Sequence, residues 1–90
     1  MFYKIFLTET AKKDLKNIEE NIAKKIIEKL FFYSTQRNPL SFAKFLRGNF
    51  HGRYRFRIGS YRAIFRINSD NRIHILIILR IKHRKDVYDL

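Results

Sequence analysis

Residues 53–67 read RYRFRIGSYRAIFRI, and this stretch decides the fold. Apolar and polar side chains alternate on both sides of a Gly-Ser pair, which is typical of two strands joined by a two-residue hairpin turn. That turn sets a register in which Arg57 lies opposite Arg62. The aromatic and aliphatic side chains of both strands then share the other face, so the stretch predicts a hairpin with one buried face.

The segments outside the hairpin complete a pattern of strands and helices. Residues 3–7 read as a first strand, and residues 72–81 form an almost continuous aliphatic strand that suits the interior of a sheet. Between them, apolar residues recur at three- and four-residue spacing from Ala11 to Phe31, which predicts an amphipathic helix. This helix is long for a globular protein, so we expect a break near residues 17–20 and hence a helical hairpin.

The remaining segments read as connections. Residues 34–52 contain a proline and two glycines, with a helical turn expected around Phe42, Phe45 and Leu46. Residues 68–71 read as a second turn and residues 82–90 as a polar tail. The prediction is one α+β domain over residues 1–90. Its N-terminal strand and helical hairpin pack on one face of a small, mainly antiparallel four-stranded sheet, in the order β-α-α-β-β-β.

Composition excludes several classes of protein. Hydrophobic residues make up 46% of the chain and aromatic residues 16%, which is enough for a small core and argues against disorder. The chain has no cysteine, so disulfides and thiolate chemistry are excluded. The longest aliphatic run, Ile75 to Leu79, is too short to cross a bilayer. We therefore expect a soluble cytoplasmic protein with no membrane partner.

Positive charge dominates the chain. Its 20 Lys and Arg residues exceed its 8 Asp and Glu residues, for a net charge of +12, and no carboxylate occurs from Lys29 through Ser69. Like charges directly opposed on a sheet cost roughly 0.2–1 kcal/mol per pair. Two such pairs are expected across the hairpin: Arg57 with Arg62, and Arg53 with Arg66. This pattern predicts a face that binds a polyanion. The alternative is a generally basic surface whose arginines spread apart into water.

The expected polyanion is a nucleic acid. Guanidinium groups match the geometry of phosphate through two parallel hydrogen bonds, and several of them on a rigid sheet suit a polynucleotide backbone. Aromatic side chains between the arginines can stack on bases, which favours single-stranded RNA or DNA. We expect nucleic acid to contact the basic residues in and around the hairpin, namely Lys44, Arg47, Arg53, Arg66 and Lys82.

The sequence predicts chemistry without a metal or other cofactor. It has no paired carboxylates in its basic half, no metal-ligand spacing and no glycine-rich phosphate loop. RNA can be cut without a metal when the 2′-hydroxyl attacks the adjacent phosphorus and the 5′-oxygen leaves. Arginine supplies cations for this step but does not exchange protons near neutrality. His83 and Tyr88 are the candidates for proton transfer, although His83 also reads as a surface histidine in a basic tail.

Four motifs carry a resemblance that covers nearly the whole chain. They are Leu46-Arg-Gly48, Tyr54-Arg-Phe-Arg-Ile-Gly59, Tyr61-Arg-Ala-Ile-Phe65 and His83-Arg-Lys-Asp-Val-Tyr88. In this order they resemble the RelE/ParE toxin superfamily, and within it the RelE-like mRNA interferases. The resemblance implies the toxin of a type II toxin-antitoxin system. It also implies a ribosome-dependent, metal-independent endoribonuclease that cuts mRNA in the decoding site and is held inactive by a RelB-like antitoxin.

The resemblance also implies roles for individual residues. Arg55 and Arg57 match basic residues that bind and polarise phosphate, and Arg62 matches the arginine that stabilises the transition state. We expect Arg62 to be an exposed strand residue that contributes little to stability. Near the end of the chain, His83 or Arg84 falls at a catalytic basic position and Tyr88 matches a tail tyrosine. Some relatives carry lysine where Arg55 and Arg57 stand, which directs attention to His83 and Tyr88 as proton acceptors.

Two other functions fit the same sequence. A ParE-like protein shares this fold but inhibits DNA gyrase by binding, without catalysis. A plain RNA-binding module would use the arginines only to hold the backbone. The terminal His-Arg-x-x-Val-Tyr motif and the dense arginine hairpin favour the interferase, because a protein-binding inhibitor does not need them.

Overall fold

The computed structural model describes residues 2–48, 52–70 and 73–89. Its elements in chain order are β1 (Phe2–Leu7), α1 (Glu9–Lys16), α2 (Glu20–Ser34), the 3-10 helix η1 (Pro39–Phe42), β2 (Ala43–Phe45), β3 (Tyr54–Ile58), β4 (Tyr61–Asp70), β5 (Ile73–His83) and the 3-10 helix η3 (Arg84–Asp89). The α+β class and the helical hairpin are confirmed. Within the described residues, no helix is both long and apolar enough to span a membrane.

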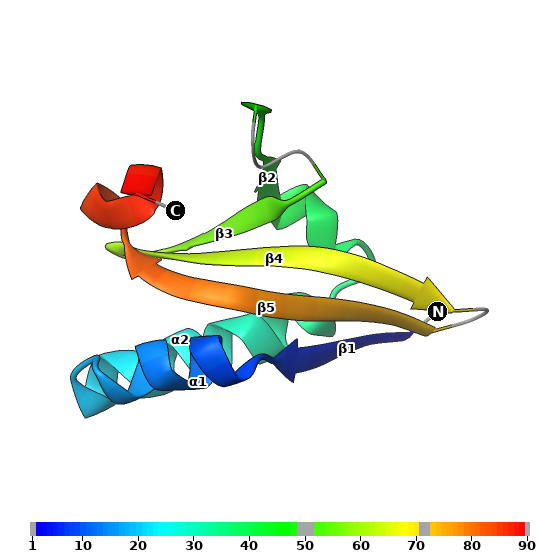
Figure 1. Cartoon of the computed structure of the whole chain (residues 1–90). Helices are drawn as coiled ribbons and strands as arrows, with labels where there is room; N and C mark the ends of the chain where they lie inside the picture. The colour runs from blue at the N-terminus through cyan, green and yellow to red at the C-terminus, as the bar shows by residue number, and fades with distance from the viewer. Residues whose placement is uncertain (1, 49–51, 71–72, 90) are drawn as a thin grey trace.

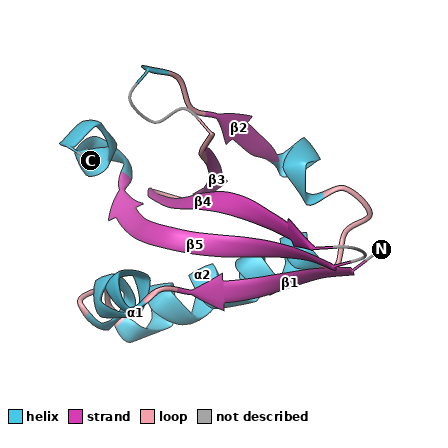
Figure 2. Cartoon of the chain, turned by 45° about the vertical axis from the view of Figure 1, so that its right-hand side comes forward, coloured by secondary structure: helices cyan, strands magenta, loops and turns pink. Residues whose placement is uncertain are grey.

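The strands form one mixed sheet in the order β1-β5-β4-β3-β2. Strand β1 pairs with β5 in parallel, and the other neighbours are antiparallel. Figure 1 shows α1 and α2 on one side of the sheet and η3 on the other, and Figure 2 shows β1 and β2 at opposite edges. We call the side away from α1 and α2 the open face.

The sheet has five strands, so the predicted number of four is wrong. The additional strand is β2, where Ala43 pairs with Phe56 and Phe45 with Tyr54. The helical turn expected around Phe42, Phe45 and Leu46 is limited to η1, which ends at Phe42. Three residues are too few to show a periodic pattern, and pairing with β3 makes this segment a strand.

Two other predicted boundaries also differ from the structure. Strand β4 continues to Asp70, so Asn68 and Ser69 belong to the strand and not to a turn. At the other end of the chain, β5 includes Lys82 and His83, and η3 replaces most of the expected polar tail. Asn71 and Arg72 lie outside the described residues. Backbone pairing between β4 and β5 overrides the polar character of these segments.

The break between the helices has a local cause at each end. The Asn17 amide donates to Asp14 O and Leu15 O where α1 ends, and the Glu19 carboxylate accepts from the Asn21 and Ile22 amides at the start of α2. Side-chain caps of this kind satisfy amides that have no partner within the helix. The predicted break is therefore confirmed, and it produces an αα-hairpin that lies on the sheet.

The start of α1 is hydrogen-bonded to β5 just beyond the point where β1 ends. The Thr8 hydroxyl donates to Ile78 O at 3.0 Å, and the Asp14 carboxylate accepts from the Ile81 amide at 2.9 Å. Asp14 also accepts from Nε and NH2 of Arg80 at 2.9 and 3.1 Å. These hydrogen bonds raise the pKa of Arg80 above its ordinary value. Together they cover the free edge of β5 and fix its C-terminal end.

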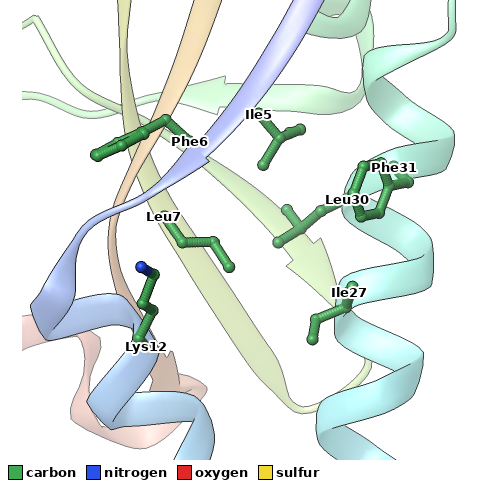
Figure 3. Close-up of a pocket in the computed structure, with 7 residues that line it drawn as sticks. All are labelled: Ile5, Phe6, Leu7, Lys12, Ile27, Leu30 and Phe31. Carbon is green, nitrogen blue, oxygen red and sulfur yellow. The ribbon is translucent and has the colours of Figure 1, made fainter.

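The core lies between the sheet and the two helices. Its fully buried side chains include Phe56, Phe65, Leu76 and Ile78 from the sheet and Ile26 and Leu30 from α2. Figure 3 shows Ile5 and Leu7 of β1 pointing toward Ile27 and Leu30 of α2 around an apolar cavity of about 210 Å³. This layer supports the β3–β4 hairpin on the helix side of the sheet, and the basic residues lie on the open face.

Candidate nucleic-acid interface

The hairpin of β3 and β4 has the predicted register. Arg57 lies opposite Arg62, and Ile58 lies opposite Tyr61 across the two-residue turn. Gly59 adopts a φ of +58°, a left-handed conformation that glycine tolerates without a steric penalty. Arg53 precedes β3, so its pairing with Arg66 stays a prediction.

The turn presents three consecutive backbone carbonyls, and arginine residues bind all of them. NH1 of Arg62 donates to Gly59 O at 3.0 Å and to Tyr61 O at 2.8 Å. The backbone amide of Arg84, at the start of η3, donates to Ser60 O at 2.7 Å. Figure 1 shows η3 and this turn at the same end of the sheet. The turn therefore joins two arginines that are 22 positions apart in the sequence (84 − 62).

Arg62 is buried, so its predicted exposure is wrong. Only 7% of its surface is exposed, because its guanidinium folds back over its own turn. Among the described residues, its Nε finds no hydrogen-bond acceptor. Burial lowers the pKa of the Arg62 guanidinium from its ordinary value, and three neighbouring cations lower it further, namely Arg57, Arg55 and Arg84. A buried cation surrounded by other cations is costly for the protein alone and suited to an anion.

Further basic residues extend this surface along the open face. In the strand register, Lys82 lies opposite Arg62, Lys44 lies opposite Arg55, and Arg66 lies opposite Ile77. Because strand side chains alternate between faces, these residues share the face of Arg57 and Arg62. A cavity of about 240 Å³ beside β2 is lined by Ser41, Phe42, Ala43, Lys44, Arg55 and Arg57. No carboxylate lines it, so it favours anions.

Two of the predicted contacts lie at the border of this surface. Arg47 is exposed and follows β2, and Arg53 is exposed and precedes β3. The Arg53 carbonyl accepts a hydrogen bond from the Leu46 amide at 2.9 Å, whereas neither arginine side chain forms a hydrogen bond or ion pair with another described residue. Both stay predictions as contacts to nucleic acid.

His83 lies on the helix side of the sheet, away from Arg62. It pairs with Tyr61, and the two rings meet edge to face at a centroid distance of 5.3 Å. Tyr61 shares its face with Ala63 and Phe65, which pack in the core. The register shifts between Ile64 and Phe65, so that Leu79 of β5 has no partner on β4. This bulge reverses the alternation of β5 and turns His83 toward the helices.

The other two C-terminal candidates are Arg84 and Tyr88, and both belong to η3. Arg84 is the first residue of η3, and its charge acts on Arg62. The backbone of Tyr88 lies in η3, whereas its side chain is outside the part of the chain that the structure describes. The structure thus brings together Arg55, Arg57, Arg62 and Arg84, and separates His83 from them. The sequence analysis did not predict that the carbonyls of the turn would bind Arg62 and Arg84. The Gly-Ser pair, which marks the position of the turn, was the one feature of the sequence that could have indicated these contacts.

Metal ligands do not gather in the described residues. Across residues 2–48, 52–70 and 73–89, no group of three or more His, Cys, Asp or Glu side chains is placed to hold a metal ion. The acidic side chains near the site serve other roles, since Asp14 binds Arg80. The charged groups that act on Arg62 are all cationic, namely Arg55, Arg57 and Arg84.

Comparison with known proteins places the chain in a family. A model of the ParE toxin of type II toxin-antitoxin systems matches residues 5–88. The chain belongs to the RelE/ParE toxin family. It is 34% identical over 88 residues to Toxin RelG of Mycobacterium tuberculosis, with 98% of each chain covered, and 35% identical over 91 residues to Toxin RelE3 of Methanocaldococcus jannaschii, with 96% of each covered.

A solved structure supports the same assignment for this RelE/ParE toxin. The toxin-antitoxin complex RelBE2 of Mycobacterium tuberculosis contains a chain that matches with a TM-score of 0.77 and 32% identity. The match covers 93% of this chain and 100% of the other. The RelE-like fold is thus shown, and the protein is a toxin of the type II toxin-antitoxin class.

Proposed function

We propose that this RelE/ParE toxin is a metal-independent endoribonuclease that cuts mRNA in the decoding site of the ribosome. The observation that carries the proposal is the meeting of Arg55, Arg57, Arg62 and Arg84 around the β3–β4 turn. A binding surface for a protein partner does not require a buried guanidinium beside three other cations. A reaction that builds negative charge on the phosphoryl oxygens is favoured by such a site, because the cations stabilise that charge.

The proposed reaction is the 2′-hydroxyl route that the resemblance to mRNA interferases implies, and this geometry supports it. The 2′-hydroxyl of the RNA attacks the adjacent phosphorus, a 2′-oxygen–phosphorus bond forms, and the bond to the 5′-oxygen breaks. The products are a 2′,3′-cyclic phosphate and a 5′-hydroxyl end. Arg62, held rigid by the turn carbonyls, and Arg57 opposite it stabilise the charge on the phosphoryl oxygens. We assign to Tyr88, which follows Arg84 in η3, the acceptance of the 2′-hydroxyl proton, and a solvent water protonates the leaving 5′-oxygen.

The proposal extends to the partners. The solved relative from Mycobacterium tuberculosis is a toxin-antitoxin complex, and a second, from Methanococcus jannaschii, is a RelB–RelE antitoxin-toxin complex with 33% identity and a TM-score of 0.64. This match covers 93% of the present chain and 95% of the other. By this similarity we assign a RelB-like antitoxin to the present toxin. The net charge of +12 suits both an acidic protein partner and the RNA-rich decoding site.

Programmed ribosomes provide the test. We expect the purified toxin to cut a defined message at the codon in the decoding site and to leave a 2′,3′-cyclic phosphate at the new end. A message with a single 2′-deoxynucleotide before the cut position should stay intact, because it lacks the attacking hydroxyl. Cleavage of the deoxy message would contradict the mechanism. An intact normal message combined with inhibited supercoiling by DNA gyrase would support the ParE-like function instead.

The affinity for RNA should fall steeply with salt. If the open face contacts about four phosphates of a single strand, the plot of log Kd against log salt concentration should have a slope of magnitude about 3. Fluorescence anisotropy with a labelled, 2′-deoxy-protected oligonucleotide between low and physiological salt measures this slope. Affinity that does not change with salt would contradict phosphate binding by the arginines.

A further inference from the structure

The position of Arg84 depends on the first turn of η3. The Arg84 amide donates to Ser60 O at 2.7 Å, so the backbone of η3 begins directly on the hairpin turn. Arg62 binds the two flanking carbonyls of the same turn. A small rotation of η3 about this point would change the distance between the guanidinium groups of Arg62 and Arg84. The direction in which η3 leaves the sheet therefore determines how close the Arg84 guanidinium lies to that of Arg62.

His83 is placed to provide that control. Its Nδ1 accepts a hydrogen bond from the Lys85 amide at 3.3 Å, two residues further along the chain. Asn and Asp side chains close the first turn of a helix with the same spacing. By accepting this bond, Nδ1 of His83 acts as the cap of η3.

The imidazole ring is itself held in place. It lies edge to face against the ring of Tyr61 at a centroid distance of 5.3 Å. Tyr61 is the first residue of β4 after the turn and directly precedes Arg62. Both rings line a cavity of about 270 Å³ between α1 and the end of β5, whose charged lining includes Asp14, Arg80, Lys82 and Asp86. The hydrogen bonds of Asp14 to Arg80 and Ile81 fix the strand that bears His83. His83 thus connects a rigid strand end to the first turn of η3.

We propose that His83 is a positioning residue that caps η3 and thereby sets Arg84 beside Arg62, and that it does not transfer protons. This inference rests on the proposed function for its effect on cleavage, whereas the cap itself is independent of that function. The ring faces the helix side of the sheet, so it does not reach an RNA phosphate on the open face. The structure therefore assigns a different role to a residue that sequence reasoning proposed as a base.

Two substitutions of His83 distinguish a helix cap from a general base. The His83→Asn variant keeps a side-chain acceptor for the Lys85 amide, whereas His83→Ala removes it. In single-turnover cleavage on programmed ribosomes, we expect His83→Asn to stay within about threefold of the wild-type rate and His83→Ala to lose about tenfold, the effect of one hydrogen bond. The pH profile of His83→Asn should match that of the wild type. If His83 were the base, both variants would lose orders of magnitude, and that outcome would overturn the proposal.

A second measurement does not depend on cleavage. Hydrogen exchange at the Lys85 amide should be faster in His83→Ala than in the wild type. In His83→Asn, which restores an acceptor, the exchange should be slower than in His83→Ala and close to that of the wild type. Equal exchange in all three proteins would refute the cap, even if the toxin proved not to cut RNA. Conversely, a wild-type protein that leaves messages intact but shows this exchange pattern would refute the proposed function and retain the cap. The denaturant midpoint of each variant confirms that the proteins compared are folded.

Discussion

Replacement of Arg62 by alanine is expected to lower the rate of message cleavage by roughly two to three orders of magnitude, because it removes the most preorganised cation of the site. The Arg62 guanidinium is fixed by Gly59 O and Tyr61 O and is already buried, so it needs no reorganisation when charge develops on the phosphate. Single-turnover cleavage on programmed ribosomes measures the loss. The decrease should appear in the rate constant more than in the affinity for a 2′-deoxy-protected message.

Stability and a matched control complete this test. Arg62→Ala removes two hydrogen bonds to the turn, each worth about 1 kcal/mol, but it also removes repulsion from Arg57 and an unpartnered buried N–H group. We therefore expect only a small net change in the free energy of unfolding. Arg37→Ala changes an exposed arginine in the loop after α2 and should cleave like the wild type. A folded Arg62→Ala variant with wild-type cleavage would remove Arg62 from the mechanism.

Replacement of Phe65 by alanine should lower the free energy of unfolding by about 3–5 kcal/mol, the usual cost of emptying an aromatic site in a core. Phe65 is fully buried in β4, and its ring stacks on Phe56 at a centroid distance of 4.3 Å and on Tyr54 at 5.5 Å. A small domain has only about 5–15 kcal/mol to lose. Denaturant unfolding followed by circular dichroism measures the difference.

The same truncation at an exposed phenylalanine is the control. Phe31 of α2 is 58% exposed, and Phe31→Ala should change the unfolding free energy by less than about 1 kcal/mol. Activity of Phe65→Ala should fall with the folded fraction, because the hairpin that presents Arg62 is supported by this layer of rings. Equal stability of the two variants would contradict the assignment of Phe65 to the core.

The local features of the fold were predictable from the sequence. The Gly-Ser pair predicted the register of the hairpin, and the length of the apolar periodicity predicted the helical break, which lies between the C-cap Asn17 and the N-cap Glu19. Short-range rules suffice for these features because the atoms involved are a few residues apart. The same rules placed Arg57 opposite Arg62, which is the starting point of the candidate site.

Most of the predictions that failed depend on contacts between distant segments of the chain. The bulge at Leu79 is hidden in a run of aliphatic residues, so alternation alone could not show that His83 faces the helices. Arg62 is buried by its own turn, which hydropathy does not reveal. The strand β2 exists through its pairing with β3 and not through its three residues alone. Each of these differences affects the site more than the fold class.

The parallel pairing of β1 with β5 determines when this molecule can acquire its final shape. Thr8 bonds to Ile78 across 70 residues of sequence, so β1 is synthesised well before β5, its partner in the sheet. Pairings of such high contact order form slowly and late. The sheet therefore closes only after β5 has been synthesised, and the guanidinium cluster also needs Arg84, which follows β5 directly. A fragment that ends before Arg84 would therefore lack one of the four arginines of this cluster.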